Sequence, residues 1–178
     1  FIHDVWPIYR ELHTWARYSL AEKYHQPVPE YLPAHWLPNR WGQDWSDLVN
    51  VEGLNIDNYL KNKGAEWIPK QSEKFYMSIG FDSLSPGFWK NSSLYPLAAN
   101  AGYKKNTHAS EWHLDYDTDI RSLQSIEANT EWLSTNLHEF GHVYYFKAYS
   151  NPGVPIVLRN GANRAYHEAF GTMMGLAS

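Results

Sequence analysis

The sequence predicts a mainly α-helical fold, with one short pair of β-strands ahead of a long helix. Apolar residues recur at intervals of three and four over several long segments, which is typical of amphipathic helices. Prolines and glycines interrupt these segments, and the segments 101–114 and 117–126 flank the turn-forming stretch DYDTD. Hydrophobic residues make up 43% of the 178 residues and charged residues 19%, so the chain is of the folded, globular kind.

Charge and composition narrow the classes of partner. The net charge is −4 with acidic and basic residues intermixed, which argues against nucleic acid as a partner. No apolar run approaches the roughly 20 residues needed to span a bilayer, so no membrane segment is expected in this chain. The absence of cysteine excludes disulfides and thiolate metal ligands. The oligomeric state is left open.

Four helices are predicted in the first part of the chain. Segment 4–25 is expected to be a helix capped by Asp4, and a proline-rich extended loop follows it. A second helix is expected over 39–50, a short one after Asp57, and another from Pro69, since proline is tolerated in a first turn. The apolar positions at helical spacing in the first of these are Val5, Ile8, Leu12, Trp15, Ala16 and Leu20.

The second part predicts a loop, the strand pair and two helices. Residues 81–96 resemble a loop, and segments 101–114 and 117–126 are the expected strands. Thr130 is expected to cap a long helix over 131–149, which the stretch SNPGVP ends. A last helix is expected after Asn163, and its apolar face has no partner later in the sequence. We therefore expect a piece of a larger, mostly helical protein.

The stretch STNLHEFGHVYYF, residues 134–146, contains two histidines and a glutamate at the spacing of a metal site. His138 and His142 are four residues apart, so one face of a helix can present both imidazoles to one metal ion. Catalytic zinc takes three protein ligands and keeps one position open. Glu168, in the stretch YHEAFGT of the next helix, is the expected third ligand, and Glu139 can act on water without binding the metal. The alternative is that the two histidines are ordinary polar residues of a half-buried helix.

These residues carry a family resemblance. LHEFGHVYY followed by RNGANRAYHEAFG resembles the signature of the angiotensin-converting-enzyme family of zinc peptidases, peptidase family M2. The segments LHTWARYSLAEKYH, PAHWLPNRWGQDWSDL, PGFWKNS and THASEWHLDY resemble further family segments in the same order. The resemblance implies a gluzincin-type domain fragment, in which residues 1–178 are a portion of a single catalytic domain whose C-terminal part lies outside the chain.

The resemblance also implies an activity and a set of site residues. It implies a Zn²⁺-dependent peptidyl-dipeptidase that removes C-terminal dipeptides from oligopeptides, in a periplasmic or secreted location, with chloride as a further ion of the complete protein. Glu139 would be the general base, and Gln43 would help to hold the substrate's C-terminal carboxylate. His108 and Ala109 would bind the substrate backbone. The implied zinc ligands are His138, His142 and Glu168.

Several positions depart from the family pattern. Thr107 and Ser125 stand where vertebrate members have cysteines, which suggests a bacterial-type member. Thr172 stands where an aspartate would orient a zinc-binding histidine. Glu111 and His113 replace an alanine and an aspartate, so different subsite preferences are expected.

Two hypotheses about function follow. The chain is part of an active peptidyl-dipeptidase completed by residues outside it, or it is a truncated or degenerate zinc-binding module without catalysis. The intact Glu139 favours the first, whereas Thr172 and the ending at Ser178 favour the second. Many substrate-binding groups of the family follow the zinc region, so the chain alone is expected to hold the metal site and the base but an incomplete substrate site.

Overall fold

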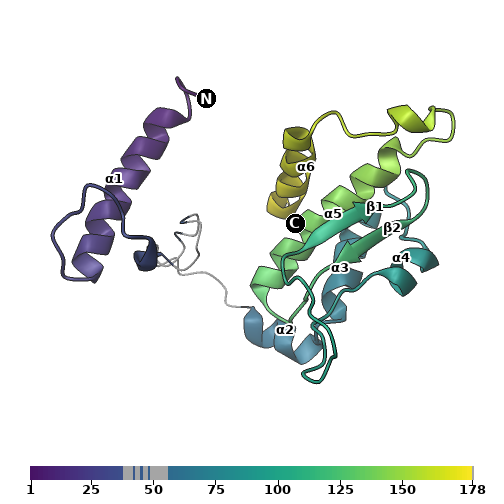
Figure 1. Ribbon diagram of the computed structural model, residues 1–178, viewed down its shortest axis with the longest axis horizontal. Coiled ribbons are helices and arrows are strands. Elements are labelled where there is room, and N and C mark those ends of the chain that lie inside the picture. The colour runs from purple at the N-terminus through teal and green to yellow at the C-terminus, as the bar shows by residue number, and fades with distance from the viewer. Residues whose placement is uncertain (38–41, 43–44, 46–47, 49–55, 178) are drawn as a thin grey trace. The chain divides into compact units, whose positions relative to one another are not determined.

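The computed structural model describes residues 1–37, 42, 45, 48 and 56–177 (Figure 1). Contacts divide the chain into two compact units, residues 1–54 and 55–178, and each unit is described by itself. The expectation of a single domain over 1–178 stays a prediction. The described part is mainly helical with one two-stranded antiparallel sheet, which confirms the fold class.

The first unit contains helix α1, Trp6–Lys23, within the predicted range 4–25. The expected cap at Asp4 is wrong, because Val5 is at the cap position and no side chain caps the helix. The N–H groups of Val5 and Trp6 instead donate to the carbonyl of Phe1, at 2.9 and 3.0 Å. Pro7 in the first turn has no N–H that needs an acceptor.

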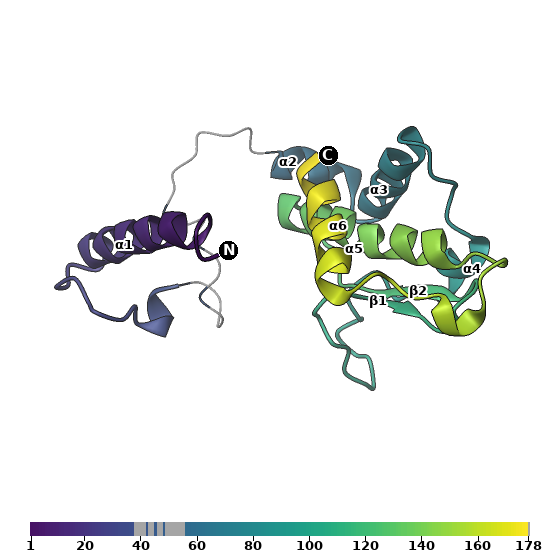
Figure 2. The same cartoon turned by 90° about the horizontal axis from the view of Figure 1, so that it is seen from above.

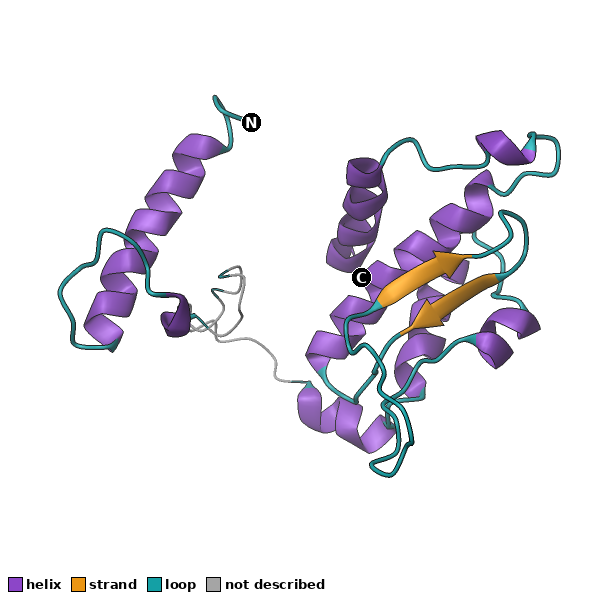
Figure 3. Cartoon of the chain, in the orientation of Figure 1, coloured by secondary structure: helices purple, strands orange, loops and turns teal. Residues whose placement is uncertain are grey.

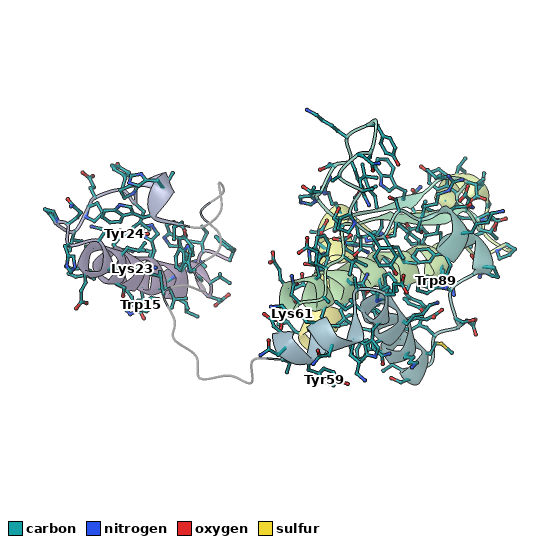
Figure 4. The ribbon with its side chains drawn as sticks, turned by 90° about the horizontal axis from the view of Figure 1, so that it is seen from below. Trp15, Lys23, Tyr24, Tyr59, Lys61 and Trp89 are labelled. Carbon is teal, nitrogen blue, oxygen red and sulfur yellow. The ribbon has the colours of Figure 1, made fainter. Side chains whose placement is uncertain are left out.

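Among the described residues, the buried side chains of α1 lie in its C-terminal half. Ala16, Leu20 and Ala21 are buried, and Leu20 and Ala21 pack against Trp36 of the 3₁₀ helix Ala34–Trp36. Tyr24, labelled in Figure 4, stacks on Trp36 with ring centroids 5.1 Å apart. The remaining predicted apolar positions of the helix are exposed within the unit: Val5, Ile8, Leu12 and Trp15. The helix predicted over 39–50 lies mostly outside the described residues.

The second unit begins with helices α2, Asp57–Lys63, and α3, Trp67–Ser78. Both agree with the sequence prediction, except that α3 begins two residues before Pro69. The loop predicted over 81–96 is wrong in part, because Pro86–Asn91 form helix α4. Ser85 Oγ accepts a hydrogen bond from the Phe88 N–H at 3.0 Å, and Pro86 occupies the first turn. A serine cap followed by proline is a strong start signal, even for a helix this short.

Strands β1, Ser110–His113, and β2, Ile120–Leu123, form the antiparallel hairpin shown in Figure 3. Each is shorter than its predicted segment. In the register of the hairpin, Glu111 lies opposite Ser122. The turn is built on Asp115, whose Oδ1 accepts hydrogen bonds from the N–H groups of Asp117 and Asp119, both at 2.9 Å.

Helices α5, Thr130–Tyr149, and α6, Arg164–Ala177, carry the histidine motif and Glu168. The cap of α5 is Asn129, whose Oδ1 accepts from the Trp132 N–H at 2.8 Å, so the predicted cap at Thr130 is wrong by one residue. The Thr130 hydroxyl donates instead to Asp57 Oδ1 at 2.5 Å. As predicted, α6 follows Asn163, whose Oδ1 accepts from the Tyr166 N–H at 2.8 Å.

Helix α5 is the centre of the second unit. Figures 1 and 2 show it between the hairpin and α3, with α6 crossing it. On the α3 side, Tyr144 stacks on Tyr76 at 4.3 Å, and the Tyr76 hydroxyl donates to the Leu137 carbonyl at 2.7 Å. The buried core residues around this pair are Leu84, Phe88, Ile120, Phe140, Val143 and Met174. This core fixes the orientation of α5, and with it the direction of the motif.

The α5–α6 crossing is built on two glycines. A Cβ on Gly141 would lie 2.7 Å from the Gly171 Cα, and a Cβ on Gly171 would lie 2.8 Å from the His138 carbonyl oxygen. The two backbones are therefore in direct contact, closer than any pair of side-chain-bearing residues would allow. This close approach brings Glu168, one turn before Gly171, beside the histidines of α5.

Candidate metal centre

The three residues predicted as zinc ligands converge. Nε2 of His138 and Nε2 of His142 are 3.0 Å apart. Oε2 of Glu168 lies 3.3 Å from the first nitrogen and 3.4 Å from the second. Tetrahedral zinc with bonds of about 2.0–2.1 Å separates its ligand atoms by about 3.3 Å. The donor triangle therefore fits one tetrahedral zinc ion, and the donor set of two imidazoles and a carboxylate is typical of catalytic zinc.

The burial of the three residues leaves one side of the triangle open. His142 is buried, whereas the Glu168 side chain is 52% exposed. A cavity that all three residues line extends from the triangle. Such an arrangement leaves room for a fourth ligand, as a catalytic site requires.

The protonation state of His142 also suits a metal ligand. The pKa of His142 is lowered to about 4, mainly by burial and in addition by the neighbouring His138, while Glu168 opposes the shift. The imidazole of His142 is therefore neutral at pH 7, and its lone pair is free to bind a cation.

Glu139 is buried next to the triangle and lines the same cavity. Its pKa is raised to about 7, mainly by burial and in addition by the charge of Glu168, while His108 acts in the opposite direction. A carboxyl group with this pKa can accept and return a proton near neutral pH. Glu139 is not among the residues that converge on the metal position.

Each histidine of the triangle has a neighbour at its other ring nitrogen. Thr172 Oγ1 lies 3.5 Å from His138 Nδ1, so Thr172 is where the resemblance places it, but at the long limit of a hydrogen bond. Nδ1 of His167 lies 2.6 Å from Nδ1 of His142. The sequence analysis did not single out His167. Its one signal was its position directly before Glu168, and consecutive helical residues point about 100° apart.

The cavity beside the triangle has a volume of about 630 Å³. Of the residues predicted to bind the substrate backbone, both His108 and Ala109 line it, together with Glu111 from β1. Its lining also includes Tyr149, Arg164 and the loop residues Asn160 and Gly161. Gln43, predicted to hold the substrate carboxylate, lies outside the described residues, so its role stays a prediction.

Of the two departures near β1, Glu111 faces the cavity and His113 does not line it. His113 Nε2 lies 3.0 Å from Ser150 Oγ, and its ring stacks on Phe146 at 5.3 Å. Glu111 Oε1 accepts hydrogen bonds from Ser122 Oγ at 2.6 Å and from Gln124 Nε2 at 3.0 Å. Its Oε2 is buried without a hydrogen-bond partner among the described residues.

Burial raises the pKa of Glu111 well above its ordinary value, and the Glu139 charge adds to this, while the bonds from Ser122 and Gln124 oppose it. The folded chain therefore holds this proton to higher pH than the unfolded chain, so the contribution of Glu111 to the stability of the metal-free protein falls as pH rises above about 4.5. Glu111→Gln keeps an acceptor for both donors and removes the titration. We expect the variant to be more stable than the wild type at pH 8 and similar at pH 4.5, as measured by urea unfolding. An equal pH dependence in both proteins would contradict this expectation.

The sequence of the chain is similar to those of known angiotensin-converting enzymes. The chain is 32% identical over 187 aligned positions to angiotensin-converting enzyme of Mesocricetus auratus. It is 31% identical to that of Rattus norvegicus and 30% identical to that of Bos taurus. Each alignment covers 98% of this chain but only 14% of the relative.

The chain thus spans about a seventh of the length of these relatives, and it contains the whole donor triangle and Glu139. The sequence model of the peptidase M2 family, described as angiotensin-converting enzyme, matches residues 1–178 without remainder. The protein is therefore a member of the peptidase M2, or angiotensin-converting-enzyme, family.

Proposed function

We propose that this chain supplies the zinc site and the general base of a peptidase that releases dipeptides from the C-terminus of oligopeptides. The observation that supports the proposal most is the triangle of His138, His142 and Glu168 donor atoms, with sides of 3.0, 3.3 and 3.4 Å, beside the buried Glu139. The dipeptide product and the oligopeptide substrate are proposed from family membership.

The residues of the site would have distinct roles in the proposed hydrolysis. Bound Zn²⁺ would polarise the scissile carbonyl and lower the pKa of water to about 7. His138 and His142 would hold the ion through Nε2, and the Glu168 carboxylate would offset part of its charge. Glu139 would accept a proton from the attacking water and return it to the leaving amine. Its burial and its pKa of about 7 suit both steps.

The hairpin offers a way to bind the peptide backbone. β1 pairs with β2 along one edge, and within the described residues its other edge has no strand beside it. An extended peptide can add to such an edge through main-chain hydrogen bonds. His108 and Ala109 precede β1 and line the cavity, so a peptide aligned there would pass beside the metal position.

The proposal is tested by product analysis with the full-length protein. A peptide with a free C-terminus should yield a dipeptide, identified by mass spectrometry. A chelator should reduce the release to background, and added Zn²⁺ should restore it. The same peptide with an amidated C-terminus is the matched control and should be a poor substrate. Zinc-loaded protein that releases no dipeptide would contradict the proposal and favour a non-catalytic zinc-binding module.

Two further proposals rest on family membership alone: chloride as an ion of the complete protein, and a periplasmic or secreted location. Among the described residues, no helix combines the length and apolar character needed to cross a bilayer. Cell fractionation and the dependence of activity on chloride concentration test the two proposals separately.

A further inference from the structure

His167 lies at the rear of the metal triangle, on α6 directly before Glu168. Its Nδ1 is 2.6 Å from Nδ1 of His142, on the side of that ring opposite the metal position. Three aromatic residues of α5 surround it with roughly perpendicular rings: Tyr145, Phe146 and Tyr149, at centroid distances of 4.7, 4.9 and 6.2 Å. The imidazole of His167 is therefore held in place by packing, with one nitrogen directed at a metal-binding histidine.

The hydrogen bond between the two rings has a defined direction when a metal is bound. Two imidazole nitrogens can form such a bond only if one carries hydrogen and the other a lone pair. His142 Nε2 offers its lone pair to the metal, so the hydrogen of its neutral ring is on Nδ1. His142 is then the donor and His167 Nδ1 the acceptor. The hydrogen of His167 is therefore on Nε2, which is buried without a hydrogen-bond partner among the described residues.

We propose that His167 is a positioning residue for the metal ligand His142. It accepts the His142 Nδ1–H, selects the tautomer whose Nε2 can bind the ion, and fixes the rotation of the ring. The inference rests on the proposed metal site. Ligating histidines generally donate their second N–H to an acceptor, and loss of that acceptor weakens metal binding. The corresponding contact of His138, to Thr172, is long at 3.5 Å, so His167 provides the closer of the two supports.

A purely structural role for His167 makes a different prediction. If its ring served only to fill the space between Tyr145, Phe146 and Tyr149, a phenylalanine would replace it at no cost to the metal. If its Nδ1 is what matters, asparagine should replace it better, because Oδ1 of asparagine can take the position of Nδ1 as an acceptor. The two substitutions therefore separate the two roles.

The experiment measures zinc affinity in the full-length protein, by competition with a chromophoric chelator. We expect His167→Phe to weaken zinc binding by about 10–100-fold. His167→Asn should recover most of that loss. His113→Phe is the matched control, because His113 belongs to the same aromatic cluster, with Phe146 and Tyr149, but contacts no residue of the triangle. It should bind zinc like the wild type.

A spectroscopic measurement reads the tautomer directly. In the zinc-loaded protein labelled with ¹⁵N-histidine, His142 should show a protonated Nδ1 and a metal-bound Nε2, and His167 a protonated Nε2. Circular dichroism checks folding, and His167→Leu, which also lacks an acceptor, takes the place of a phenylalanine variant that does not fold. Wild-type affinity in His167→Phe, or equal losses in the phenylalanine and asparagine variants, would overturn the proposal. Failure of the wild type to bind zinc would instead contradict the proposed metal site itself.

Discussion

Replacement of Glu139 by glutamine is expected to reduce peptide hydrolysis by about 10²–10⁴-fold, the usual contribution of a general base. Glutamine has nearly the same shape, but its amide cannot accept the proton of the attacking water. Zinc affinity should change little, because the converging donors are His138, His142 and Glu168. Steady-state kinetics together with zinc content per molecule measure the two effects on the same sample.

The matched control is Glu131→Gln, which makes the same change in the first turn of the same helix, at an exposed position outside the cavity. Its activity should equal that of the wild type.

The wild-type rate should also rise with pH as Glu139 loses its proton. The pKa of Glu139 is about 7 in the metal-free protein, and a bound cation lowers it. Glu139→Gln should lack this limb of the profile. A variant that keeps more than a tenth of the activity would exclude Glu139 as the base.

The second large effect is expected from Gly171→Ala. Its Cβ would lie 2.8 Å from the His138 carbonyl oxygen and 3.1 Å from atoms of the His138 ring. The first contact is with backbone, so α6 must move away from α5, and Glu168 moves with it. We expect a loss of about 1–3 kcal/mol in the free energy of unfolding, the usual cost of overpacking. We also expect at least about a tenfold loss of zinc affinity, since a site tolerates displacements of only about 0.5 Å.

Gly175→Ala provides the control on the same helix, one turn later. Its nearest neighbours would be at 3.8–4.0 Å, which is ordinary van der Waals contact. Alanine favours a helix over glycine by about 1 kcal/mol, so this variant should be at least as stable as the wild type and should bind zinc equally well. If both variants bind zinc like the wild type, the close crossing is not what places Glu168.

The parts of the site that follow from local periodicity were predictable. The periodicity of 131–149 and the helix-ending stretch SNPGVP predict one helix here. His138 and His142 are one turn apart in it, so both rings lie on the same face. The start of the last helix after Asn163 was equally local, because it depends on one side chain bonding to the backbone three residues on. The fold class and the family follow from the same kind of signal, repeated along the chain.

The errors have tertiary causes. Asn129 and Thr130 are both good cap residues, and the choice between them is settled by Asp57, which is far away in sequence and binds the Thr130 hydroxyl. Helix α4 is too short to have a period, so only its start signal at Ser85 and Pro86 marked it. The position of His167 could not be predicted, because its contact with His142 depends on how closely α5 and α6 cross. The glycines in the sequence of one helix do not show which other helix packs against them.

The low burial of α6 affects how well the protein resists proteolysis. Within the part of the chain that the structure describes, α6 buries only Gly171 and Met174, whereas α5 is buried along its middle turns. Without a metal, its backbone amides should exchange with solvent sooner than those of α5, through local opening. An ion shared by Glu168 and the two histidines would tie α6 down, and the opening free energy would rise with zinc concentration. We therefore expect a chelator to shorten the lifetime of the protein among proteases, in addition to its effect on the proposed peptide hydrolysis.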